Sequence, residues 1–345
     1  MRYVTIEKPG GYDRLRTREA PDPEAGPGEV VVDVEAAGVN YADCVVRMGL
    51  YASANEYVGW PVTPGFEAAG VVAALGEGVR GPPGGTRVIA GPRFGGHASR
   101  IAVPADQAFP IPDGVGTEEA AGFAVVYLTA WYALFELVHP RPGSTLLVHS
   151  AAGGVGGALC RLGKIAGARV VGVVGGSHKI EAARAEGADE VIDKGREDLW
   201  KAARSHAPDG YDVVLDANGP ATLKRSYEHL APAGRLVAYG FGSMLPKGKG
   251  RPNVFRLLLQ ILKLPRFNPL RLCNDNKSVL AFNLSYLFHR KDILADAMDH
   301  LLSWLKEGRV RPAPCTPYPW DRVADAHRDL ESGRTTGKLV LRFTQ

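Results

Sequence analysis

The sequence predicts an α/β protein in which a doubly wound parallel sheet is inserted into a second, β-rich domain. From about Ala120 to Gly242, short apolar runs alternate with helical patterns, which is typical of a parallel sheet covered by helices on both faces. Before about Thr117, short apolar runs are separated by clusters of proline and glycine, as in β-rich domains. The chain closes on another strand pattern, Lys338 to Phe343. We therefore expect the second domain to contain both ends of the chain.

The most informative motif lies at the start of the predicted parallel sheet. An apolar run over 145–149 leads into a glycine-rich turn, and a helical pattern to Ala166 and a second apolar run follow. In such a βαβ unit the glycines let the backbone approach a pyrophosphate, and the helix N-terminus offers free N–H groups. The strand–turn–helix context favours a dinucleotide site over an ordinary turn. The expected phosphate-binding residues are Ala152, Gly153, Gly154, Val155 and Gly156.

The second strand of this unit, residues 169–174, indicates which dinucleotide binds. An NAD site needs a carboxylate near the end of that strand to hold the ribose hydroxyls, but here no acid occurs before Glu181. Small residues, including Ser177, leave room for an extra phosphate, and Lys179 and Lys194 could neutralise it. We therefore expect NADP(H), bound in part by Ser177, Lys179 and Lys194. The alternative is that both lysines are solvated surface charges.

The bulk properties are those of a globular protein without a membrane anchor. The chain has 345 residues, enough for two domains with their own cores, and a net charge of +4 that does not imply nucleic-acid binding. Its four cysteines form no CxxC pair, so neither a disulfide framework nor a zinc ribbon is expected. No signal-peptide pattern occurs, and the uncharged run 120–135 is shorter than the ~20 residues of a membrane span. We expect a cytoplasmic protein with this run buried between its domains.

Motifs spread over nearly the whole chain resemble the zinc-independent quinone oxidoreductases of the medium-chain dehydrogenase/reductase superfamily. They are Val39-Asn40-Tyr41-Ala42-Asp43, the stretch TPGFEAAGVV at 63–72, the SAAGGVG turn and TGKL at 336–339. Segments 281–287 and 320–326 are most similar to the vesicle amine transport protein homologues within that group. The resemblance implies a Rossmann NADP-binding domain at 123–265, inserted in a GroES-like catalytic domain at 1–122 and 266–345. It also implies a homodimer, formed through sheet edges near 279–284.

The zinc-containing members of the superfamily provide a test for a metal. They place a cysteine ligand where Asn40 stands, a histidine ligand at Phe66 and a third ligand near Val125. An amide, a phenyl and an isopropyl group cannot hold Zn²⁺, and the four-cysteine structural zinc loop is missing. We therefore expect no metal, and a structural role for Glu67. Without a Lewis acid, alcohol oxidation is disfavoured, and hydride transfer from NADPH to a quinone or an α,β-unsaturated carbonyl remains feasible.

The resemblance places Asn40 and Tyr51 in the acceptor pocket. Asn40 could donate a hydrogen bond to a carbonyl, and Tyr51 could donate a hydrogen bond or the proton, unless it is a loop aromatic that packs on the domain. A second family tyrosine is replaced by Val45, which makes the pocket more apolar. Asp43 and Arg47 lie four positions apart, so they could form a helical ion pair.

Further cofactor contacts are assigned by resemblance and position. They are Thr129, Asn218, Gly240, Phe241, Phe282, Leu284 and Arg334.

A basic, partly apolar stretch at 247–271 does not fit a simple reductase. Between His229 and Asn274 no acidic residue occurs, so the stretch could lie on an anionic membrane or contact an RNA backbone. We favour a lid or dimer-edge element with its leucines packed inward, and expect no nucleic acid. Two other functions stay open: an enoyl-thioester reductase of a biosynthetic pathway, and a nucleotide-binding, membrane-associated protein with little turnover.

Overall fold

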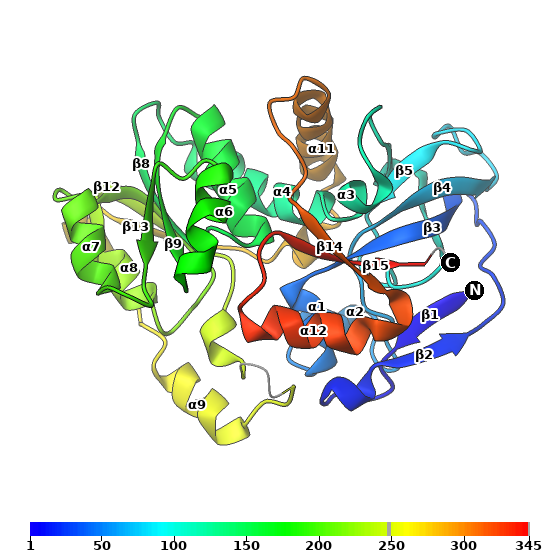
Figure 1. Ribbon diagram of the computed structural model, residues 1–345, viewed down its shortest axis with the longest axis horizontal. Helices are drawn as coiled ribbons and strands as arrows, with labels where there is room; N and C mark the ends of the chain where they lie inside the picture. Colours follow the sequence, from blue (N-terminus) through cyan, green and yellow to red (C-terminus); the bar gives the residue numbers. More distant parts are fainter. Residues whose placement is uncertain (247–249, 344–345) are drawn as a thin grey trace. The chain divides into compact units, whose positions relative to one another are not determined.

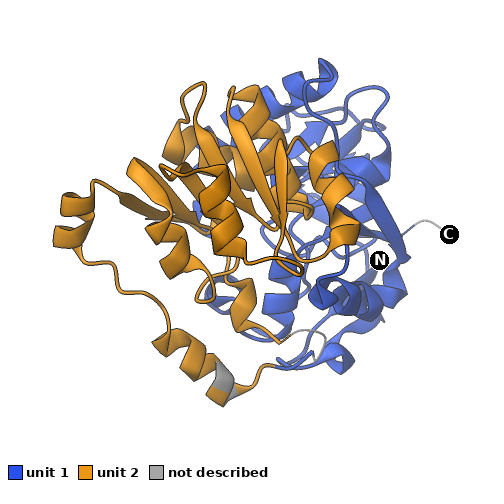
Figure 2. Ribbon diagram, turned by 60° about the vertical axis from the view of Figure 1, so that its left-hand side comes forward, with its two compact units in different colours: residues 1–128, 247–251, 285–345 blue, residues 129–246, 252–284 orange. Residues whose placement is uncertain are grey.

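The computed structural model describes residues 1–246 and 250–343, apart from the side chains at positions 254 and 256. The chain forms two compact units, which Figure 2 colours separately: unit 1 with residues 1–128, 247–251 and 285–345, and unit 2 with residues 129–246 and 252–284. The expected boundary at 265/266 falls earlier than the one at 284/285. The reason is a strand at 278–281, which forms backbone hydrogen bonds within the sheet of unit 2.

Unit 2 is built on a parallel sheet. Over the described residues its six strands have the order β10-β9-β8-β11-β12-β13, and every neighbouring pair is parallel. The strands are β8 Thr145–His149, β9 Arg169–Val174, β10 Glu190–Asp193, β11 Tyr211–Asp216, β12 Leu230–Ala238 and β13 Ser278–Ala281. β9 is buried along nearly its whole length, because a parallel sheet covered on both faces favours continuous apolar runs over alternation.

Helices cover both faces of this sheet. The helices are α5 Gly154–Ile165, α6 Ile180–Ala185, α7 Leu199–His206, α8 Leu223–Glu228, α9 Val254–Leu262 and α10 Pro269–Asp275. Figure 1 shows α5 and α6 on one side of the strands, and α7 and α8 on the other. On the α7 and α8 side, Leu147, Ile192 and Leu236 from the strands pack with Ala203 and Tyr227 from the helices. The doubly wound architecture predicted from the alternating pattern is thus present.

Unit 1 is the β-rich part. Its larger sheet follows the order β14-β15-β3-β4-β5-β7 over the described residues, with β6 also paired to β3, and β1 and β2 form a separate pair. The strands are β1 Arg2–Thr5, β2 Arg16–Glu19, β3 Glu29–Val39, β4 Ala68–Leu75, β5 Arg87–Ala90, β6 Arg100–Pro104, β7 Ala108–Pro110, β14 Cys315–Pro319 and β15 Lys338–Arg342. Both chain ends therefore contribute to one unit, as expected.

The remaining helices complete unit 1 and lead into unit 2. They are α1 Tyr41–Arg47, α2 Ala52–Tyr57, α3 Thr117–Ala121, α4 Ala124–Trp131, α11 Lys291–Lys306 and α12 Val323–Ser332, and a π-helix follows α4 at Tyr132–Val138. The uncharged run expected as one helix is thus divided between α3, α4 and the π-helix. Among the described residues, no helix combines the length and the apolar character needed to cross a membrane.

Candidate functional site

The glycine-rich turn joins β8 to α5, as the motif predicts. Gly153 is the N-cap of α5, and its first helical residues are Gly154, Val155 and Gly156. A Cβ atom on Gly156 would overlap the carbonyl oxygen of Ser150, so only glycine lets the helix start this close to the turn. The first turn of α5 carries no acidic side chain. Its free N–H groups and the positive end of its dipole therefore offer a site for an anion.

Several predicted cofactor residues meet beside this turn, because β8, β11 and β12 are neighbours and end at the same edge of the sheet. Gly219 follows β11 and faces Phe241 after β12, since a Cβ at Gly219 would lie 2.8 Å from Phe241 Cδ1. Asn218 Nδ2 is buried and has no hydrogen-bond partner among the described residues. An orphaned buried donor costs free energy unless a ligand accepts from it. This edge of the sheet thus fits a bound dinucleotide.

The shape of the loop after β11 depends on Asp216, a residue that the sequence analysis missed. Asp216 Oδ1 accepts hydrogen bonds from the backbone N–H groups of Asn218 (2.8 Å) and Gly219 (3.1 Å). The hydroxyl groups of Thr222 (2.9 Å) and Ser226 (2.8 Å) donate to the same carboxylate. Asp216 therefore fixes the turn that presents Asn218. An aspartate at the end of a predicted parallel strand was the available signal.

The expected phosphate pocket lies at the ends of β9 and β10. Burial lowers the pKa of Lys179, and the positive charge of Lys194 lowers it further, so the structure brings the two lysines near each other. Ser177 Oγ donates to Asp193 Oδ2 at 2.6 Å, and this hydroxyl holds the pKa of Asp193 below its ordinary value. Asp193 is an acid that the sequence analysis did not weigh. Its carboxylate also accepts from the N–H of Gly195 at 2.9 Å.

The other predicted cofactor residues lie in both units. Thr129 and Leu284 belong to unit 2, whereas Arg334 belongs to unit 1. Phe282 follows β13, and its ring lies 4.9 Å from that of Tyr132 between ring centres. The backbone N–H of Arg334 donates to Ser332 Oγ at 3.1 Å, just after α12. The roles of these residues stay predictions.

In unit 1, Asn40 follows β3 directly and precedes α1. It is buried, and both ends of its side-chain amide are hydrogen-bonded: Nδ2 donates to Glu67 Oε1 at 3.0 Å, and Oδ1 accepts from Lys338 Nζ at 2.6 Å. Glu67 and Lys338 are buried as well, and their charged atoms lie 2.7 Å apart. Lys338 belongs to the TGKL motif, but the sequence gave no reason to place it beside Asn40.

Tyr51 and the positions of the expected zinc ligands have aromatic or aliphatic surroundings. The Tyr51 ring lies 5.6 Å from Phe66 and 6.4 Å from Phe94 between centroids, in edge-to-face geometry. Phe66 is buried in the core of unit 1, and Val125 packs against that core. The aromatic packing considered for Tyr51 is therefore present. It leaves the role of the hydroxyl as a prediction.

Asp43 and Arg47 do not form the helical ion pair considered from their spacing. Asp43 accepts backbone N–H groups from Asn40 at 2.7 Å and Gly65 at 2.8 Å. The fully buried Arg47 instead donates to Glu331 Oε1 at 2.6 Å. The pairing differs because α12, from a distant part of the chain, packs on α1; such a contact leaves no trace in local spacing.

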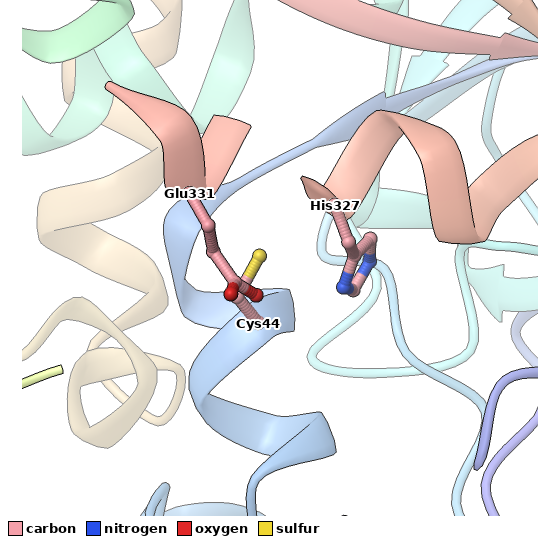
Figure 3. Close-up of side chains that lie close together, drawn as sticks. All are labelled: Cys44, His327 and Glu331. Carbon is pink, nitrogen blue, oxygen red and sulfur yellow. The ribbon is translucent and has the colours of Figure 1, made fainter. Parts of the chain in front are cut away.

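One group of side chains in the described residues has metal-like spacing: Cys44, His327 and Glu331, all buried (Figure 3). Arg47 lies among them, because its guanidinium also contacts His327 Nδ1 at 3.2 Å. Burial raises the pKa of the Cys44 thiol well above its usual range and lowers that of His327, which Arg47 lowers further. A neutral thiol and a neighbouring guanidinium disfavour a cation there. The group is better explained as a buried polar network.

Helix α9 carries apolar side chains that face solvent, contrary to the expectation that its leucines pack inward. Figure 2 shows it apart from the sheet of its own unit. Phe255 is 81% exposed and Leu262 78%, and Leu258 and Leu259 are also exposed. Leu264 and Phe267, which come after the helix, pack on the unit 2 core instead. Lys247 and Lys249, at the start of the basic stretch, lie outside the described residues.

Comparison with known proteins places both units. Residues 26–113 match the alcohol dehydrogenase GroES-like domain, and residues 186–341 match a zinc-binding dehydrogenase domain. The chain is 35% identical to the rat synaptic vesicle membrane protein VAT-1 homolog over 99% of its own length and 84% of that protein. It is 34% identical over 99% of its length to 15% of a phenolphthiocerol/phthiocerol polyketide synthase subunit of Mycobacterium tuberculosis. Escherichia coli quinone oxidoreductase, solved with NADPH, superimposes with a TM-score of 0.85, at 28% identity and coverage of 99% and 100%.

Proposed function

Because this chain belongs to the quinone oxidoreductase-like branch of the medium-chain dehydrogenase/reductase superfamily, with VAT-1 homologues among its relatives, we propose that it is a zinc-independent reductase. It transfers hydride from NADPH to a quinone or an α,β-unsaturated carbonyl. The observation that carries this proposal is Asn40: at the position of a zinc ligand in related enzymes, it presents a buried amide held between Glu67 and Lys338. An amide can bind a carbonyl oxygen but cannot replace a Lewis acid.

NADP(H) is the cofactor, and when bound it supplies the hydride. The N–H groups at the start of α5 bind the pyrophosphate, and Asn218 Nδ2, a buried donor without a protein partner in the described part of the chain, is available to the nucleotide. Lys179 and Lys194 bind the ribose phosphate, because two neighbouring ammonium groups lose their mutual repulsion when a phosphate lies with them. Asn40 donates to the acceptor oxygen as negative charge develops on it. Tyr51 lines the same pocket.

The test is NADPH oxidation, followed optically, against ortho- and para-quinones, 2-alkenals and enoyl thioesters, with NADH as the control. We expect turnover with NADPH and quinones or alkenals, unchanged after dialysis against a chelator. Loss of activity on chelation, restored by Zn²⁺, would refute zinc independence. Equal use of NADH would refute the phosphate pocket.

A second candidate is an enoyl-thioester reductase. The 34% identity to part of a polyketide synthase subunit favours it, and the hydride chemistry is the same. In the panel above, a kcat/KM for enoyl thioesters at least tenfold above that for quinones and alkenals would establish it. Preference for free quinones would exclude it.

A third candidate is a nucleotide-binding protein that lies on membranes and turns over little. The exposed apolar face of α9 favours it, since Lys263 and Arg266 follow directly and could contact anionic lipid. Sedimentation with phosphatidylserine vesicles, but not with phosphatidylcholine vesicles, would support it. Leu259→Asp should then abolish binding, whereas Leu75→Asp, at an exposed leucine of unit 1, should not. No sedimentation at low salt would refute it.

We also propose that the protein is a cytoplasmic homodimer. In the described residues β13 is an edge strand of the six-stranded sheet, and such an edge can pair with that of a second copy. Light scattering tests the dimer, and a monomer mass at micromolar concentration would contradict it. Fractionation of cells that express the protein tests the location.

A further inference from the structure

Asn40, Glu67 and Lys338 form a closed buried network. The Lys338 ammonium donates to Val39 O at 3.1 Å and to Asn40 Oδ1 at 2.6 Å, and it pairs with Glu67 Oε1 at 2.7 Å. A lysine has three N–H donors, so these three acceptors use all of them. The second carboxylate oxygen of Glu67 accepts from the N–H of Val125 at 2.8 Å. Both charged groups are therefore fully hydrogen-bonded, as buried charges need to be.

The two charges give the Asn40 amide a single orientation. An amide has nearly the same shape when it is rotated by 180°, so packing alone would not distinguish its oxygen from its nitrogen. Rotation here would turn Oδ1 toward the carboxylate of Glu67 and Nδ2 toward the ammonium of Lys338. Both contacts would become repulsive in a site shielded from water, where charge interactions are strong.

One hydrogen of Asn40 Nδ2 remains available after this network is complete. Nδ2 carries two hydrogens, and Glu67 accepts one of them. Because the amide plane and its orientation are both set, the direction of the second N–H is set as well. Glu67 and Lys338 themselves have no donor left to offer an acceptor.

The backbone around the network is shaped to admit the two charged side chains. A Cβ on Gly38 would lie 2.5 Å from Glu67 Oε1, and a Cβ on Gly122 would lie 3.1 Å from Lys338 Cγ. Antiparallel pairing of β3 with β15 puts Val39 opposite Leu339, which brings Lys338 next to Asn40. Local glycines and strand register thus both hold this arrangement.

We infer that Glu67 and Lys338 are positioning residues, which fix the free N–H of Asn40 for the oxygen of the hydride acceptor. This inference rests on the proposed function of Asn40. A donor that is already oriented needs no reorganisation when charge develops on the acceptor, and removal of such a donor commonly costs about 10²–10³ in kcat. Loss of its orientation alone should cost less, about 10- to 100-fold.

The experiment removes both charges together, since a single substitution would leave an unpaired buried ion and could prevent folding. The double variant Glu67→Gln/Lys338→Met no longer distinguishes the two amide orientations. We expect kcat for the best acceptor to fall about 10- to 100-fold, with Kd for NADPH unchanged. The matched control is Arg290→Met/Asp292→Asn, which removes an exposed ion pair and should leave kcat unchanged.

A background without the amide separates positioning from a merely structural role. In Asn40→Ala, the same double substitution should lower kcat no further, because there is no N–H left to orient. If the two effects multiply instead, or if the double variant keeps wild-type kcat, the inference is overturned.

A readout without turnover distinguishes this inference from the proposed function. If the wild-type protein reduces no acceptor, the proposed function fails, and the amide is then followed by NMR of ¹⁵N-asparagine-labelled protein. The Asn40 side-chain signal is the one missing in Asn40→Ala. Its two Nδ2 protons should have widely separated shifts in the wild type and converge in the double variant. Unchanged shifts would overturn the inference.

Discussion

Replacement of Lys179 by alanine tests the phosphate pocket most directly. Lys179 is half-buried beside Lys194, and both burial and this neighbour lower its pKa. A hydrogen bond from such a cation to a phosphate contributes about 1.5–3 kcal/mol. Lys179→Ala should therefore raise Kd for NADPH roughly 10- to 150-fold, since 1.4 kcal/mol is a factor of ten. Kd for NADH, which lacks this phosphate, should change less than about twofold.

The assay is titration of NADPH and NADH by calorimetry, with the exposed Lys201 of α7 as the control site. Lys201→Ala should change neither Kd. A phosphate favours protonated Lys179, so binding takes up protons and Kd for NADPH should rise as pH rises through the lowered pKa of Lys179. Lys179→Ala should lose that part of the pH dependence. Equal weakening of NADPH and NADH binding would refute the assignment.

Three other substitutions test the buried networks and the turn. Arg47→Met should lower the free energy of unfolding, measured in urea, by about 3–5 kcal/mol, because Glu331 then lacks its buried counter-charge; a loss below about 1 kcal/mol would contradict this. The pKa of His327 is lowered by burial, so the unfolded chain binds a proton that the native protein does not. Stability should fall by up to about 1.4 kcal/mol per pH unit below about pH 6.5, and more gently in His327→Gln; equal slopes would exclude His327 as the cause. Gly156→Val should abolish binding of both dinucleotides, because the added side chain overlaps Ser150, and calorimetry that shows normal binding would refute the close approach.

The parallel sheet and the glycine-rich turn could be predicted because their signals are local. The apolar run over β9 and the glycines at the start of α5 lie within one βαβ unit, and the periodicity of each segment reports its own environment. The limits of unit 2 were harder to predict. β13 is short and only partly buried, and its place in the sheet depends on pairing with β12, which the strand's own residues do not specify.

The candidate site was predictable in its residues but not in their partners. Asn40 stood out because it replaces a metal ligand of related enzymes, whereas Lys338 lies almost 300 positions further along the chain. Only the register of β3 with β15 brings the two together. The spacing of Asp43 and Arg47 gave a wrong partner for the same reason, since α12 supplies Glu331. Long-range contacts decide which of several possible local pairs forms.

The place of β15 in its sheet has a consequence for synthesis of the protein. β15 lies between β14 and β3, and Leu339 pairs with Val39, 300 positions earlier. At roughly 5–20 residues per second, the ribosome needs about 15–60 s to make the chain between them. Half of one edge of β3 stays open throughout that interval, and an open edge can pair with other chains. The last strand to be translated therefore completes the first unit, and the nascent protein depends on protection until its C-terminal residues emerge.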